Sequence, residues 1–168
     1  MTLLDAPKFD AARELRRRVF LYSTVGFLTV LLIAWWLVAG RPVDWPWSWN
    51  SYLFARSTVN KFLSDVEKND MPAAYGVWIH DKNWQQHPEL HGGYPFARFQ
   101  QDWSSTSPDN EYGAIQSHEI ALAGHYGNGV LVAVLINGRK SKPLNLDYDP
   151  QAKSLDFAPP GVELYLGP

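Results

Sequence analysis

Residues 19–40 form an unbroken stretch of 22 residues without a charged side chain. A helix rises about 1.5 Å per residue, so about 20 apolar residues span the hydrocarbon core of a bilayer. The core helix of a soluble protein normally keeps a polar face, whereas the run from Leu28 to Ile33 surrounds this helix with apolar side chains. The stretch therefore predicts a transmembrane helix over residues 19–40.

Basic residues mark one end of this stretch. Four arginines precede it closely: Arg13, Arg16, Arg17 and Arg18. Only Arg41 follows it closely. Because positively charged flanks stay in the cytoplasm, residues 1–18 are predicted to be a cytoplasmic basic tail, and everything after the span is predicted to lie outside the membrane.

Two export signals are alternatives to a permanent anchor. Val38 and Gly40 are small enough to resemble a signal-peptidase cleavage site, although the apolar core is longer than the usual 7–15 residues. Residues 17–21, RRVFL, resemble a twin-arginine export signal, but Arg16 and Tyr22 depart from the usual pattern. The length of the core favours an uncleaved anchor in which the arginines set the topology.

Composition excludes several classes of function. The residues after the span hold ten basic and fourteen acidic side chains, and this net charge of −4 argues against a nucleic-acid-binding surface. The absence of cysteine excludes disulfides, thiolate metal sites and a lipid-modified cysteine.

Residues 41–49, RPVDWPWSW, predict a short juxtamembrane linker. Pro42 and Pro46 discourage helix formation, and tryptophan favours the headgroup level of a bilayer. The linker is therefore expected to hold residues 50–168, a single small domain outside the membrane, close to its surface.

Within that domain, helical periodicity comes first and strand periodicity second. Helices are predicted from Asn50 or Ser51 to Lys68, after Pro72, and over 95–103. Strands are predicted over 111–125, 130–136, 144–148 and 155–157, with a tight turn at Asn137-Gly138. This order predicts an α+β fold, with three helices packed on a curved four-stranded antiparallel sheet that forms a cone-shaped roll.

A long helix, the turn Lys68-Asn69-Asp70 and then Ala73-Ala74-Tyr75 give the domain a resemblance to the nuclear-transport-factor-2-like, or cystatin-like, superfamily, over about residues 51–158. The chain also resembles small bacterial proteins with a basic tail, one span and such a domain. This resemblance implies a bacterial inner-membrane protein with a periplasmic or extracellular domain, and it implies a cavity between sheet and helices that some superfamily members use for catalysis.

Candidate cavity residues follow from that resemblance. The titratable candidates are Tyr75, His80, Asp102 and His118, and the aromatic candidates are Trp78, Phe99 and Trp103. Their spacing brings no acid–base pair together, and small domains need large aromatic side chains for their cores. No catalytic residue and no cofactor is therefore assigned, and the aromatic candidates are interpreted mainly as core.

The histidines His87 and His91 stand four residues apart, a spacing that can bind zinc on a helix. Pro88 and Gly92-Gly93 interrupt such a helix, and a third ligand would have to be His80 or a carboxylate. The interpretation adopted is a solvated loop without a metal.

Residues 130–136, VLVAVLI, are apolar on both faces of the predicted strand. The helices can cover only one face, so the other needs a partner or a C-terminal flap. The candidate interaction face consists of Val130, Val132, Val134 and Ile136, with Leu131, Ala133 and Leu135 as the alternative set. The sequence thus favours a non-enzymatic membrane-anchored domain that binds a protein partner or a second copy of the chain through its sheet. The alternative function is that of a small-molecule binder or a cavity enzyme of the isomerase, dehydratase or hydrolase type.

Overall fold

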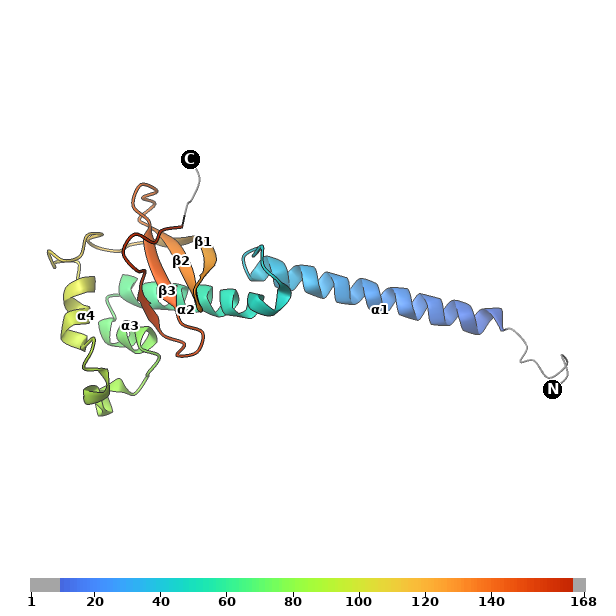
Figure 1. Ribbon diagram of the computed structural model, residues 1–168, viewed down its shortest axis with the longest axis horizontal. Helices are drawn as coiled ribbons and strands as arrows, with labels where there is room; N and C mark the ends of the chain where they lie inside the picture. The colour runs from blue at the N-terminus through green and yellow to red at the C-terminus, as the bar shows by residue number, and fades with distance from the viewer. Residues whose placement is uncertain (1–9, 165–168) are drawn as a thin grey trace. The chain divides into compact units, whose positions relative to one another are not determined.

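The computed structural model describes residues 10–164, and the chain divides into two compact units, Met1–Val38 and Ala39–Pro168. Figure 1 shows a long helix in the first unit, and helices with an antiparallel sheet in the second. The predicted α+β fold is thereby confirmed. Residues 1–9 of the predicted tail lie outside the described residues.

The first unit is the helix α1, Ala11–Val38, none of whose side chains is buried. It is long and apolar enough to cross a membrane, which is consistent with membrane association. The hydroxyls of Thr24 and Thr29 donate to the carbonyls of Phe20 and Val25 at 2.8 and 2.9 Å, which satisfies them without water.

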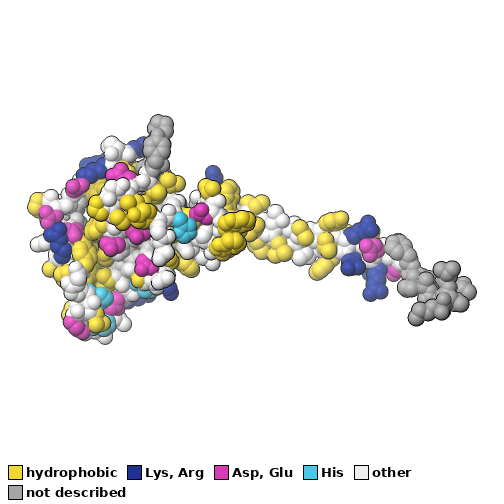
Figure 2. Space-filling model, in the orientation of Figure 1, with side chains coloured by type: hydrophobic (Ala, Val, Ile, Leu, Met, Phe, Trp, Pro, Cys, Tyr) yellow, Lys and Arg dark blue, Asp and Glu magenta, His cyan; other side chains and the backbone are white. Residues whose placement is uncertain are grey.

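The boundaries of this helix differ from the predicted span. It begins eight residues before Val19, because Asp10 caps it by accepting hydrogen bonds from the backbone N–H groups of Ala12 and Arg13. Its first turns therefore carry the basic side chains, which Figure 2 shows in dark blue at the start of an otherwise mostly apolar helix. It ends at Val38, two residues before the predicted Gly40.

Residues 39–49 belong to the second unit instead of forming a separate linker. Asp44 ties them to the domain: its backbone carbonyl accepts from Trp49 Nε1 at 2.8 Å, and its carboxylate accepts from the Tyr52 hydroxyl. A short 3₁₀ helix, η2 (Pro46–Ser48), leads directly into the first helix of the domain, because proline is well suited to a first helical position. The helix therefore begins at Trp49, one residue before the predicted start.

Three helices follow: α2 (Trp49–Glu67), α3 (Met71–Trp78) and α4 (Phe96–Trp103). The connection between the first two is set by its sequence. Asn69 adopts a positive φ of 57°, and the N–H of Asp70 donates to the Asp65 carbonyl, so α2 ends in a Schellman motif. The Asp70 carboxylate then caps α3 by accepting from the N–H of Ala73.

The sheet has the order β1-β2-β3-β4, with all neighbours antiparallel. Its strands are β1 (His118–Tyr126), β2 (Gly129–Ile136), β3 (Leu144–Tyr148) and β4 (Leu155–Phe157). The predicted turn is confirmed, since Asn137 and Gly138 have φ values of 52° and 69°. In Figure 1, α2 lies across one face of this sheet.

The first strand is shorter than predicted, because residues 111–117 are irregular. Asn137 explains how this segment is held without a strand partner. Its side-chain oxygen accepts from the N–H groups of Gln116 and Ser117, and its side-chain amide donates to the Ala114 carbonyl at 2.8 Å. One turn residue thus replaces several ladder hydrogen bonds.

The predicted interaction face is wrong. Its four side chains are fully buried in the core shared with the helices: Val130, Val132, Val134 and Ile136. The alternative set points to the outer face and is also buried, with Leu131, Ala133 and Leu135 at most 8% exposed. Part of the cover comes from the C-terminal segment, since a Cβ added at Gly124 on this face would lie 3.1 Å from Leu164 Cδ2.

Two acidic residues, Asp147 and Asp156, stand directly opposite each other on the outer face of β3 and β4. Burial, and then the negative charges of Asp156 and Asp149, raise the pKa of the Asp147 carboxyl. The folded state therefore binds the Asp147 proton more tightly than the unfolded state, so the ionised carboxylate destabilises the fold at neutral pH and this cost disappears in acid.

We expect Asp147→Asn to raise the free energy of unfolding at pH 7 by about 0.2–1 kcal/mol, the usual size of a cross-strand charge effect. The gain should vanish below about pH 4, where the carboxyl of the unfolded chain is protonated as well. Urea unfolding at several pH values measures this. Asp147→Asn and Asp156→Asn should be less than additive, because either change removes the same repulsion; full additivity would contradict the explanation.

Candidate functional site

Aromatic rings fill the space between the sheet and the helices. The ring of Phe62 on α2 lies 5.2, 6.1 and 4.8 Å, centroid to centroid, from the rings of Trp78, Phe99 and Trp103. All four side chains are buried. These three aromatic candidates therefore belong to the core between the sheet and the helices.

The four titratable candidates do not converge. Tyr75 is buried on α3, and its hydroxyl donates to the Tyr94 carbonyl at 2.6 Å. His80 is exposed just after the same helix, with a positive φ of 55°. Asp102 lies on α4, and His118 on β1 contacts Glu67 and Asn60 of α2 at 2.6 and 3.0 Å. No hydrogen bond or ion pair of the described structure joins any two of these four side chains, so they do not form an acid–base pair.

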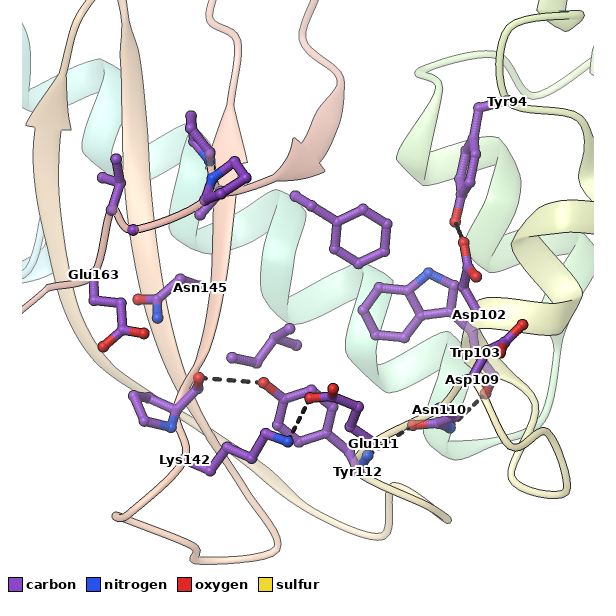
Figure 3. A pocket seen from close by; sticks show the side chains of 18 of the residues that line it. Tyr94, Asp102, Trp103, Asp109, Asn110, Glu111, Tyr112, Lys142, Asn145 and Glu163 are labelled. Carbon is purple, nitrogen blue, oxygen red and sulfur yellow. Dashed lines mark hydrogen bonds and ion pairs between the residues drawn. The ribbon is translucent and has the colours of Figure 1, made fainter.

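An open cleft lies on the side of the aromatic core where α4, the loop that follows it, the start of β3 and the C-terminal segment meet (Figure 3). Its volume is about 680 Å³. Apolar lining comes mainly from Trp103, Tyr112, Leu144 and Phe157, and charged side chains of both signs stand around it. Of the candidate cavity residues, only Asp102 and Trp103 line this cleft.

Asn110 fixes the shape of the loop on one wall of the cleft. Its side-chain amide donates to the carbonyls of Ser104 and Gly113 at 3.1 and 2.9 Å, and its side-chain oxygen accepts from the N–H of Tyr112 at 2.9 Å. On the facing wall, the Tyr112 hydroxyl donates to the Pro143 carbonyl, so the loop is joined to the start of β3. The cleft is therefore held open by hydrogen bonds and not only by packing.

Two residues that line the cleft each carry a buried polar atom without a hydrogen-bond partner in the described part of the chain. The two atoms are Trp103 Nε1, a donor whose side chain is 4% exposed, and Asn145 Oδ1, an acceptor on β3. The Trp103 N–H lies beside the Tyr94 hydroxyl and acts to lower the pKa of that group, but the two do not meet hydrogen-bond geometry. Buried polar atoms of this kind are normally paired, so each offers a bond to a ligand.

Five charged residues of the cleft are already paired with one another. Arg98 contacts Asp102 at 3.0 Å and Asp109 at 3.5 Å, and Lys142 pairs with Glu111. The Tyr94 hydroxyl donates to Asp102 at 2.7 Å, and burial together with this carboxylate raises the pKa of Tyr94 well above its usual value. Tyr94 thus stays protonated, and the arrangement suits binding better than proton transfer.

No sequence pattern distinguishes Tyr94 or Asn145 as a site residue. Pro95 is the N-cap residue of α4, so Tyr94 lies just before the helix that carries Asp102 and can reach its carboxylate. Alternation along β3 places the Asn145 side chain on the face away from the core, where polar residues are common. The remaining motif, His87 and His91, lies away from the cleft and beside Asp81.

No family model, no curated protein and no solved structure matches the chain. The assignment of residues after the span to the nuclear-transport-factor-2-like superfamily therefore stays a prediction, and function has to be argued from the described residues alone.

Proposed function

We propose that this chain is a single-pass protein of a bacterial inner membrane whose C-terminal domain lies outside the cytoplasm and binds a segment of a protein partner in the cleft, without catalysis. The proposal includes a nuclear-transport-factor-2-like fold for that domain. The observation that carries it is the contrast between the filled interior and the open cleft, which has one unpaired donor and one unpaired acceptor.

The anchor and its surroundings support the membrane part of the proposal. The arginines at the start of α1 favour a cytoplasmic N-terminus. Trp45 and Trp47, a few residues after the end of that helix, stack at 5.3 Å and are 70% and 77% exposed. Exposed indoles favour the headgroup region, so a membrane surface gives this pair a favourable environment that water does not.

The chemistry of the cleft supports a peptide ligand. A peptide group offers a carbonyl for the Trp103 N–H and an N–H for Asn145 Oδ1, so one extended segment can satisfy both orphan atoms. Figure 3 shows Asn145 and Trp103 on different walls of the cleft. The cleft is also lined by Leu144 and Phe157, against which apolar side chains of a peptide can pack. Anchoring both partners in one membrane raises their effective concentration and makes a modest affinity sufficient.

Site-specific photocrosslinking in membranes tests this function. A photoreactive residue at the exposed Ser141, which lines the cleft, should crosslink to a protein, whereas the same residue at the exposed Lys68, which does not, should give no such product. Trp103→Phe keeps an aromatic side chain but removes the indole N–H, and should lower the yield at least about fivefold, the effect of losing a buried hydrogen bond.

The outcomes separate the two functions considered for the chain. A product that contains a second copy of the chain would identify the partner as the protein itself. Equal products from Ser141 and Lys68, or none from either, would contradict a protein-binding cleft. A small molecule that copurifies with the wild type and is lost in Trp103→Phe would instead support the small-molecule alternative.

A further inference from the structure

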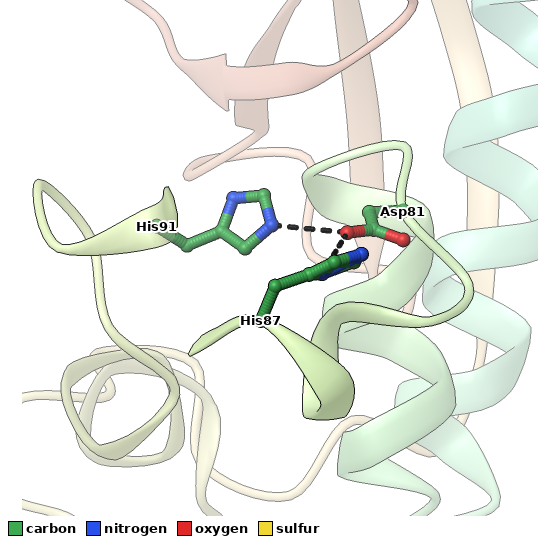
Figure 4. A group of neighbouring side chains, drawn as sticks. All are labelled: Asp81, His87 and His91. Carbon is green, nitrogen blue, oxygen red and sulfur yellow. Dashed lines mark hydrogen bonds and ion pairs between the residues drawn. The ribbon is translucent and has the colours of Figure 1, made fainter. Parts of the chain in front are cut away.

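Three potential metal ligands meet in the segment between α3 and α4. They are Asp81, His87 and His91, and one ligand atom from each lies within 4.8 Å of the other two (Figure 4). The 3₁₀ helices η3 (Trp84–Gln86) and η4 (Pro88–His91) carry the segment past Asp81. The loop predicted from Pro88 and Gly92-Gly93 thus brings the histidines together on 3₁₀ turns, not on a regular α-helix.

The end of α3 places the carboxylate. His80 takes the left-handed position of a Schellman motif, in which the N–H of Asp81 donates to the Gly76 carbonyl at 2.9 Å. Gly76 permits this close return, since a Cβ there would lie 3.0 Å from the Asp81 carbonyl oxygen. Asp81 Oδ1 accepts from the N–H of Asn83 at 2.8 Å, which orients the carboxylate with Oδ2 toward the histidines.

The histidine segment is attached firmly to the core. Trp84 Nε1 donates to the Pro72 carbonyl at 3.2 Å, and its ring packs against Tyr75 and Phe96 at centroid distances of 4.9 and 4.7 Å. The His91 ring also lies edge-on to Tyr75, at 6.4 Å. The three ligand side chains therefore project from backbone that is anchored on both sides, which limits the entropy lost when an ion binds.

The ligand distances fit a tetrahedral ion. Asp81 Oδ2 lies 3.1 Å from His91 Nε2 and 3.5 Å from His87 Nδ1. Bonds of 2.0–2.1 Å to a tetrahedral zinc ion separate its ligand atoms by about 3.4 Å. Both distances lie close to that separation, and the three ligand atoms all lie within 4.8 Å of one another.

A second observation points to a missing partner at this place. His87 Nδ1 is buried and has no hydrogen-bond partner among the described residues, although it faces the Asp81 carboxylate at 3.5 Å. The nitrogen is therefore near the carboxylate without forming a hydrogen bond to it, and a metal ion between the three side chains would use its lone pair.

We propose that Asp81 Oδ2, His87 Nδ1 and His91 Nε2 bind one zinc ion, with a fourth position open to water or to a group from a partner. Two imidazoles and one carboxylate form a ligand set that zinc prefers over magnesium or calcium, which take oxygen ligands. The site is independent of the cleft, because none of its three residues lines it.

Zinc competition titrations of the untagged full chain in detergent, against a chromophoric chelator, test the site. The wild type should bind one equivalent, and His87→Gln or Asp81→Asn should weaken binding at least about 100-fold, because even the loss of a second-shell group costs 10–100-fold. His80→Asn is the matched control: it removes an imidazole next to the site and keeps a residue that tolerates positive φ, so the affinity should not change.

Cobalt provides a readout that does not depend on variants. Co²⁺ bound to the wild type should show the intense visible absorption of a tetrahedral site, and zinc should displace it. Weakening by His80→Asn equal to that by His87→Gln, or a wild-type chain that binds no stoichiometric zinc, would overturn the proposal. Thermal unfolding without metal shows whether each variant is folded before its affinity is compared.

Discussion

Phe62→Ala is expected to lower the free energy of unfolding of the C-terminal domain by about 3–5 kcal/mol, a large part of the about 5–15 kcal/mol that stabilises a typical domain. The Phe62 side chain is fully buried, and its ring contacts three further rings of the core. Removing it leaves a cavity that the neighbouring indoles cannot fill without leaving their own contacts. Urea unfolding of the full chain in detergent, followed by tryptophan fluorescence, measures the change.

The matched control is Phe54→Ala on the same helix. Phe54 is 56% exposed, so its removal should change the free energy of unfolding by less than about 0.5 kcal/mol. A loss of stability in Phe54→Ala as large as that in Phe62→Ala would contradict a special role of the aromatic cluster, because alanine favours a helix more than phenylalanine does. It would also weaken the argument that the space between sheet and helices serves packing.

Replacement of Arg13, Arg16, Arg17 and Arg18 by glutamine is expected to abolish the uniform orientation of the chain and give a mixture of two topologies. Each basic residue near the cytoplasmic surface contributes about 1 kcal/mol, so the four together outweigh the single arginine beyond the span. The chain has no cysteine, so a Ser105→Cys variant carries one thiol at an exposed position of the domain. In intact cells, a membrane-impermeant maleimide should label this thiol fully when the arginines are present. After the arginine replacement, it should label the thiol only partly.

The control for this experiment removes charge far from the span. Arg139→Gln, Lys140→Gln and Lys153→Gln together should leave labelling unchanged, since positions distant from the span do not set orientation. Labelling of Ser105→Cys only after lysis in the otherwise unchanged chain would reverse the proposed topology. A mature protein that begins after Gly40 would replace the anchor with a cleaved signal.

Local sequence signals predicted the elements of the domain well where one interaction dominates. Asn137-Gly138 requires two positive φ values and has them, and Asp70 caps the helix expected after Pro72. Predictions failed where a side chain far away in sequence decides the backbone. Residues 111–117 alternate like a strand, but Asn137 holds them as an irregular segment instead.

The two candidate sites were predicted only in part, for the same reason. The sequence shows His87 and His91 as a pair but favours a solvated loop without a metal, since their carboxylate partner depends on a positive φ at His80, which returns the chain toward the loop. Asp102 was a candidate, but its hydroxyl partner Tyr94 and the unpaired Asn145 of the same cleft had no distinguishing pattern.

The sequence by itself determined the apolar helix, the order of helices and strands, and the buried character of 130–136, because each follows from hydropathy or turn chemistry within a few residues. Only the tertiary structure decided which side chains of β2 face the helices and what covers the other side. Alternation places successive side chains on opposite faces but cannot tell inner from outer when both are apolar. That choice depends on α2 and the C-terminal segment, which lie far away along the chain.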